Sequence, residues 1–291
     1  MWLLALCIST PALAGVPAND QGLTASQIVE KNVAARGGLE AWRKIQSMAW
    51  AGHIESTNAP APRPSFVLEM KRPNKTRFEI KAQSQTSVRM YDGTNGWKVH
   101  PASHGNPEVQ PYSPDELRFA RDGLGIDGPL MDYQAKGIAV ALDGVDEIDG
   151  RKAYRLSVKL PSGNSHHVWV DAKTFLDVKY DRVSRNKFGQ SSTVSVFYRN
   201  YKTIEGLQIP LLIESGVDTA KATEKLVIDK VSLNPPLADR MFAKPGVTGW
   251  RSTATVDIDA SRSVRQSAGP SLPMRFPRLN TRSMSDSGVA Q

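Results

Sequence analysis

The glycine-containing stretch YDGTNGW, residues 91 to 97, has the residue types of a phosphate-binding loop. Backbone N–H groups of closely spaced glycines can surround an anion, and Thr94 adds a hydroxyl. Such a loop leads from a strand into the N-terminus of a helix, but WKVH, residues 97 to 100, alternates as a strand does and then meets Pro101. We therefore predict a β-hairpin, in which glycine supplies the positive φ of the turn.

Histidines and carboxylates in the sequence indicate neither a metal site nor a catalytic group. His166 and His167 are adjacent on an expected strand, so their rings point to opposite faces and cannot bind one ion together. No HExxH motif, zinc-binding cysteine set or G-x-S-x-G motif is present. The carboxylates that remain have turn or cap explanations: Asp92, Asp127, Asp132 and Asp171. We therefore expect no metal site and see no catalytic motif, while carboxylates that converge only in the folded chain stay open at this point.

Helices are expected at three places in the chain. Thr24 and Gln27 form a capping-box pattern and Gly37-Gly38 a stop, which predicts a helix over 25 to 36. A shorter helix is expected over 39 to 45. The pattern SPDE from Ser113 predicts a third helix that ends at Gly123, followed by a loop with a helical turn through 124 to 133.

The rest of the chain up to about residue 245 alternates with a period of two from Met48 onward. Short connections rich in Gly, Asp and Asn separate roughly eleven such segments, and no helix lies between most consecutive ones. These features exclude a parallel α/β sheet, so we predict a mainly β (α+β) fold built on one large antiparallel meander.

The two ends of the chain differ from this body. Residues 1–14 end in Ala12-Leu13-Ala14 after a short apolar run, which predicts a signal peptide and export of a soluble chain. Cys7, the only cysteine, lies in that segment, so we expect no disulfide in the mature protein. Residues 15–245 form the predicted domain. Residues 246–291 are rich in Ser, Thr, Arg and Pro, which predicts a low-complexity tail.

The net charge of +8 does not indicate nucleic-acid binding. The tail carries +3 of it through six Arg against three Asp, and the body's charges alternate in sign without a basic stripe. We therefore expect no nucleic-acid partner.

The predicted sheet has more apolar surface than its short helices can cover. A curved sheet of this size either closes on a solid core or leaves a hollow lined by its side chains, and the sequence alone allows both. Bulky, adaptable side chains suited to acyl chains are the candidates for lining a hollow. They are Phe66, Leu68, Met70, Phe78, Ile80, Met90, Trp97, Leu130, Met131, Tyr154 and Leu156.

Phrases along the chain, in order from about Leu23 to Pro245, resemble outer-membrane lipoprotein-sorting proteins related to the LolA/LolB carriers. They include AARGGLEAWRKIQSM, MKRPNKTRFEI, YDGTNGW, DGPLMDYQAKG, VDEIDGRKAYRLSV, VWVDAKTFLDVKYD, YRNYKTIEGLQIPLLIES and VSLNPPLADRMFAKP. The resemblance implies a half-open antiparallel β-barrel with short helices as a lid, an apolar cavity for acyl chains, and no catalytic residue or cofactor.

From these features we expect a periplasmic, monomeric carrier that holds a lipid or acylated, lipoprotein-like ligand and exchanges it with membrane-associated donor and acceptor proteins. Two alternatives stay open at this point. One is a periplasmic sensor or interaction module that uses the same barrel as a scaffold, and the other is an exported hydrolase of an unrecognised type.

Overall fold

The structure is a computed structural model and describes residues 22–56, 63–101, 107–123, 125–185, 191–217 and 224–246. The predicted signal peptide, residues 1–14, lies outside these ranges, and so does the predicted tail except for Gly246. None of the helices in the described ranges combines the length and the apolar character needed to span a bilayer.

A single antiparallel sheet dominates the fold, as the alternating sequence predicts. Across the described ranges it has 13 strands, where about eleven were expected. The strands are β1 (Ser47–Ser56), β2 (Ser65–Lys71), β3 (Lys75–Ala82), β4 (Gln85–Tyr91), β5 (Gly96–His100), β6 (Glu108–Pro111), β7 (Ala139–Ile148), β8 (Arg151–Lys159), β9 (Ser165–Asp171), β10 (Asp177–Arg185), β11 (Ser191–Ile204), β12 (Leu207–Val217) and β13 (Glu224–Leu233).

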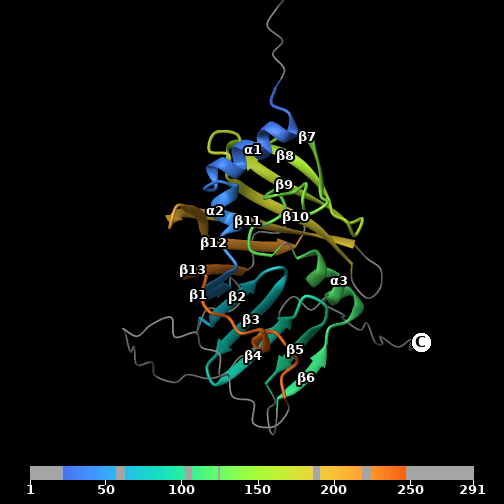
Figure 1. Ribbon diagram of the computed structural model, residues 1–291, viewed down its shortest axis with the longest axis vertical. Helices are drawn as coiled ribbons and strands as arrows, with labels where there is room; N and C mark the ends of the chain where they lie inside the picture. The colour runs from blue at the N-terminus through green and yellow to red at the C-terminus, as the bar shows by residue number, and fades with distance from the viewer. Residues whose placement is uncertain are drawn as a thin grey trace, which may run out of the picture.

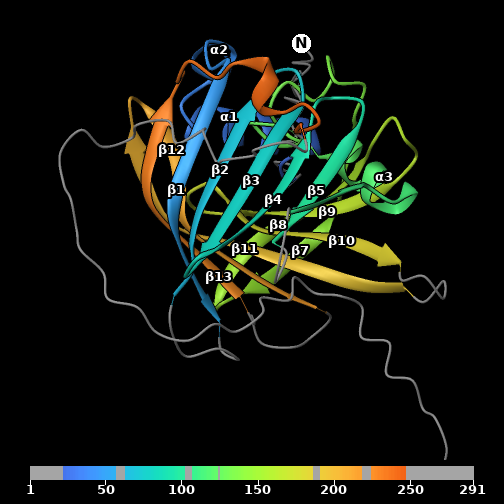
Figure 2. The same cartoon turned by 90° about the horizontal axis from the view of Figure 1, so that it is seen from below.

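The sheet consists of two meanders joined at one seam. Strands β1 to β6 follow one another in space, and β7 to β13 do the same, while β1 pairs antiparallel with β13. Figure 1 shows the two meanders as the lower and upper parts of the molecule. In Figure 2 the sheet curves so that the two parts face each other. This is the half-open, incompletely closed barrel that the sequence resemblance implies, with free edges at β6 and β7.

Helices α1 (Ala25–Ala35) and α2 (Leu39–Arg43) begin where the sequence predicts. The capping box is present, because the N–H of Gln27 donates to Thr24 Oγ1 at 3.3 Å and the N–H of Thr24 donates to Gln27 Oε1 at 2.9 Å. Gly37 adopts φ of +112° directly after the helix, which ends α1 and turns the chain into α2.

The third helix, α3 (Pro114–Asp122), also has the predicted capping box, between Ser113 and Glu116. The Glu116 carboxylate accepts hydrogen bonds from Lys98 Nζ at 2.9 Å and from Arg89 at 2.9 Å. Burial alone would raise the pKa of Glu116, but the N–H of Ser113 and the two cations outweigh it and lower the pKa to about 2. The helix is thereby fastened to β4 and β5.

The stretch YDGTNGW forms the β4–β5 hairpin, as predicted. The N–H of Asp92 donates to the carbonyl of Asn95 at 3.0 Å, and Asp92 Oδ1 accepts the N–H of Thr94 at 2.8 Å. Gly93 has φ of +102°, which fits the predicted role of glycine in the turn. Gly96 serves another purpose, because a Cβ at this position would lie 2.0 Å from the ring of Tyr112.

The chain after β13 crosses the outer face of the first meander. A short 3₁₀ turn, η1 (Asp239–Met241), is held there because Lys71 and Lys75 both bind the Asp239 carboxylate, at 2.7 and 2.9 Å. Beneath this region Glu69 is fully buried and accepts a hydrogen bond from Arg77 at 2.9 Å, while burial raises the pKa of the Glu69 carboxyl.

Candidate functional site

The face of the sheet that carries Phe66, Leu68 and Met70 is the inner face. Residues directly opposite each other in an antiparallel pair share a face, so Phe78 and Ile80 of β3 lie on it as well. Phe66, Met70 and Ile80 are 2%, 6% and 3% exposed, and Leu68 and Phe78 are half-buried. The Phe66 and Phe78 rings pack 5.8 Å apart between centroids. Five of the predicted lining residues therefore form one continuous apolar surface.

Helix α2 and the β1–β13 seam extend this surface. Trp42 and Ile45 pack with Met48, Met70 and Met131, and a second cluster places Ile54 and Ile228 against Phe66 and Ile80. Trp50 contacts both clusters and joins them. The inner face of the first meander is thus apolar from α2 across to β3.

The second meander carries its own apolar cluster beneath α1. Leu156 is fully buried there with Leu130 and with Ile28 and Val29 of α1, and Tyr154 packs against the same group. Tyr154, Leu156 and Leu130 therefore lie together, in a different cluster from Phe66 and Met70.

Segment 125–137 joins the two meanders. Its neighbouring residues Leu130 and Met131 are 1% and 0% exposed and enter different clusters, Leu130 that of α1 and β8, and Met131 that of α2 and β2. Ile126 also enters the α2 cluster. With α1 and α2, this segment covers the inner face.

Met90 and Trp97 lie on the opposite face from the other lining candidates. Met90 is directly opposite Arg77 in the β3–β4 pair, and Trp97 is directly opposite Met90 in the β4–β5 pair. Both pack with Val88 and Val99 in a separate cluster on the outer face. Alternation shows which residues share a face, but it does not show which face points inward.

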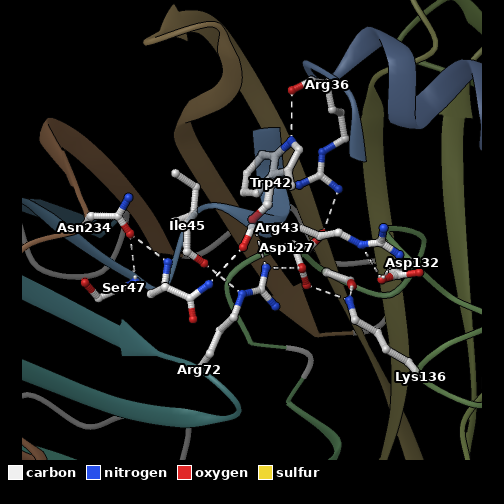
Figure 3. A network of polar contacts seen from close by, with 12 residues as sticks. Arg36, Trp42, Arg43, Ile45, Ser47, Arg72, Asp127, Asp132, Lys136 and Asn234 are labelled. Carbon is white, nitrogen blue, oxygen red and sulfur yellow. Dashed lines mark hydrogen bonds and ion pairs between the residues drawn. The ribbon is translucent and has the colours of Figure 1, made fainter. Parts of the chain in front are cut away.

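A network of charged groups fastens segment 125–137 (Figure 3). The buried Asp127 carboxylate accepts from Arg72 at 2.6 Å through Oδ2 and from Lys136 Nζ at 2.6 Å through Oδ1. Arg36 donates to the Asp127 carbonyl at 2.9 Å. On the exposed side, Arg43 donates to Asp132 Oδ2 at 2.9 Å. Cations from α1, α2 and the end of β2 thus hold one short segment.

Buried acidic and polar groups continue this network under α1. Arg36 Nη1 lies 3.4 Å from Asp177 Oδ2, and Asn32 donates to Asp177 Oδ1 at 3.0 Å. Burial raises the pKa of Asp177 although Arg36 and Asn32 act in the other direction. Burial likewise lowers the pKa of Lys136, against the raising effect of Asp127. Burial also raises the pKa of nearby Tyr198 to about 12.

Sequence reasoning missed this charged network. Asp127 had a turn explanation, and Arg36, Arg72 and Lys136 have no spacing that connects them. The available signal was indirect: Arg72 directly follows the last residue of β2, and Arg36 directly follows the last residue of α1.

His166 and His167 alternate along β9, and His167 lies between Asp143 and Asp181, at 3.2 and 3.3 Å. Across the described ranges, no three His, Cys, Asp or Glu side chains are arranged to hold a metal ion.

Several solved structures are similar to this chain at low sequence identity. A LolA superfamily protein from Nitrosomonas europaea matches with 18% identity and a TM-score of 0.48, over 77% of this chain and 99% of that one. A DUF1329 family protein from Desulfovibrio piger matches with 16% identity and a TM-score of 0.48, over 75% and 97% of the two chains.

A domain described as an outer membrane lipoprotein-sorting protein, from Vibrio parahaemolyticus, matches with 13% identity and a TM-score of 0.40, over 75% and 95% of the two chains. No protein-family model and no curated protein matches the sequence. At these identities the likeness concerns the fold and does not extend to a ligand.

Proposed function

We propose that the protein binds an acyl chain, from a lipid or an acylated protein, on the inner face of its sheet. The observation that carries this proposal is that segment 125–137 covers an apolar surface. Charged contacts to Arg36, Arg72 and Arg43 fasten this cover. The side chains of Arg72 and Arg43 are 25% and 50% exposed, so water can replace their contacts. In the closed form the chain's own side chains fill the inner face, so binding begins when the segment moves aside.

The energy of acyl-chain transfer is sufficient for such a carrier. Burying an acyl chain contributes about 0.8 kcal/mol per CH₂, so a chain of about 14 carbons supplies ~10 kcal/mol. Opening the segment and ordering the ligand subtract from this. The remainder supports reversible binding without covalent chemistry, and the proposed role is therefore non-catalytic and needs no cofactor.

We place this activity in the periplasm, with residues 1–14 as the signal peptide, 15–245 as the binding domain and 246–291 as a tail without a role in the site. The proposed form is a monomer that exchanges its ligand with membrane-associated donor and acceptor proteins. The ordered phrases that resemble the LolA/LolB carriers support this setting.

Native mass spectrometry tests the proposal. The mature chain would be exported in bacteria, purified without detergent and measured intact, and its bound material then extracted into organic solvent and identified. A stoichiometric lipid or acyl species is the expected result. A clean apo mass together with no binding of a fluorescent fatty acid would contradict the proposal.

One observation favours a scaffold role as a second candidate. Strand β7 is a free edge of the sheet, and its Leu142 and Val145 are 38% and 54% exposed. A partner could add a strand at this edge. Val145→Lys would then abolish capture of that partner from periplasmic extract and leave acyl binding unchanged, whereas unchanged capture would contradict this role.

A further inference from the structure

Three cations contact one aspartate, Asp127, at the end of the inner face. Arg72 and Lys136 each bind the Asp127 carboxylate at 2.6 Å, and Arg36 binds its backbone carbonyl at 2.9 Å. The Asp127 side chain is only 4% exposed. Figure 3 shows these groups pointing toward one another from three separate parts of the chain.

The charges of this cluster do not balance. Asp127 and Asp177 are the carboxylates that contact it, against the cations Arg36, Arg72 and Lys136. The Arg36 side chain is 9% exposed, and its Nε has no hydrogen-bond partner. A buried guanidinium N–H without an acceptor is costly, and it indicates that the cluster can accept a further anionic group.

The two arginines belong to parts of the fold that stay in place when segment 125–137 moves. Arg36 caps α1, and Arg72 follows β2 directly and donates to the carbonyls of Trp42 and Ile45 at 3.1 and 2.8 Å. Arg36 also lies over the Trp42 ring, 4.7 Å from its centroid. The arginines therefore stand where the apolar surface of α2 and β2 ends.

Asp127 and Lys136 both lie on the moving segment. They can leave together as an ion pair, so their mutual attraction is retained when the segment moves. Their departure leaves Arg36 and Arg72 without the carboxylate and carbonyl that they hold in the closed form.

We propose that Arg36 and Arg72 bind the carboxylate head of a single-chain amphiphile, in the place that Asp127 occupies in the closed form. This inference rests on the proposed function, because the acyl chain of the same ligand lies on the adjacent inner face. Arginine suits this role, since its planar donors match a carboxylate in two directions. Asp127 then competes with the ligand for the same arginines.

Two kinds of variant should behave differently: those that remove the arginines of the site and those that only loosen the closed form. The ratio of affinities for a carboxylate and a neutral amphiphile depends only on the open form, and so on Arg36 and Arg72. Substitutions that loosen the closed form, Asp127→Asn or Arg43→Gln, raise both affinities and leave the ratio unchanged. Arg43 is the matched control because it binds the same segment through Asp132, outside the cluster.

Isothermal titration calorimetry of the detergent-free mature protein tests this. Dodecanoate and dodecylammonium are titrated below their micelle concentrations, and dodecanol below its solubility limit. We expect dodecanoate to bind about tenfold more tightly than dodecanol, and dodecylammonium more weakly than either, in line with one charge-assisted contact. Arg72→Gln should remove the preference for dodecanoate, and Arg43→Gln should preserve it.

Two results contradict the inference, and they are distinguishable. If dodecanoate and dodecanol bind equally well to the wild-type protein, the carboxylate site is wrong while the acyl-binding function stands. If none of the three ligands binds, the proposed function itself fails. The wild-type ligand order decides the matter even if Arg72→Gln does not fold.

Discussion

Asp127→Asn tests whether charged contacts hold segment 125–137 closed. The substitution preserves the size of the side chain but removes the charge that Arg72 and Lys136 bind at 2.6 Å each. Breaking a buried ion pair costs about 3–5 kcal/mol. Because the side chains of Arg72 and Lys136 are 25% and 26% exposed, water compensates part of the loss, and we expect about 2–3 kcal/mol.

Hydrogen exchange measured by mass spectrometry reports this loss of stability for individual peptides of the chain. A loss of about 2–3 kcal/mol corresponds to exchange about 30- to 150-fold faster in peptides that cover 126–137, since ~1.4 kcal/mol is a factor of ten. Peptides from the centres of β2 and β9 should change much less. The segment would then be a unit that opens on its own.

Asp132→Asn is the matched control. Asp132 lies on the same segment at a positive φ of +54°, which Asn tolerates, and it pairs with Arg43, whose side chain is 50% exposed. An exposed pair contributes little to stability, so exchange should rise less than about fivefold. Equal effects of the two substitutions, or acceleration spread evenly over the sheet, would refute the reasoning.

Three further substitutions test other parts of the structure. Glu116→Gln should lower the free energy of unfolding by about 1–2 kcal/mol at pH 7. A carboxyl whose pKa falls to about 2 corresponds to ~3 kcal/mol, and solvent screening reduces this value. Because the pKa is lowered in the folded state, the difference in unfolding free energy should be constant above about pH 5 and disappear as the pH falls toward 2. Urea unfolding from pH 7 to pH 2 measures it. A difference that stays constant over the whole range would contradict the assignment. Met131→Ala should lower the free energy of unfolding, measured in urea, by about 2–4 kcal/mol, because Met131 is fully buried. A loss below about 1 kcal/mol would mean that neighbouring side chains move in and fill the cavity. Gly96→Ala should cost about 1–3 kcal/mol by displacing the Tyr112 ring, and an unchanged melting temperature would show that the ring moves without penalty.

Local sequence signals predicted much of this fold. The capping residues Thr24 and Ser113 located two helix starts, and alternation with short turns gave an antiparallel sheet. These signals succeed because caps and half-buried strands depend on neighbours within a few residues. Strand β6 was missed because it is short and its Pro111 weakens the strand pattern.

Long-range features could not be read in the same way. The pairing of β1 with β13 joins residues far apart in the chain, and no local pattern specifies it. Met90 and Trp97 were assigned to the same surface as Phe66, although the structure places them on the other face, beside Arg77. The charge cluster combines Arg36, Arg72, Asp127 and Lys136, which only the folded chain brings together.

The central claim is that an acyl chain lies on the inner face, and tryptophan quenching by a brominated acyl chain tests it most directly. Trp50 contacts the two inner clusters, and Trp97 packs on the outer face. Bromine on the chain of dodecanoate quenches only tryptophans that it contacts. We predict that Trp50→Phe lowers the quenched fraction of the fluorescence and that Trp97→Phe raises it. The reverse pattern, or no quenching at saturating ligand, would contradict acyl binding on the inner face.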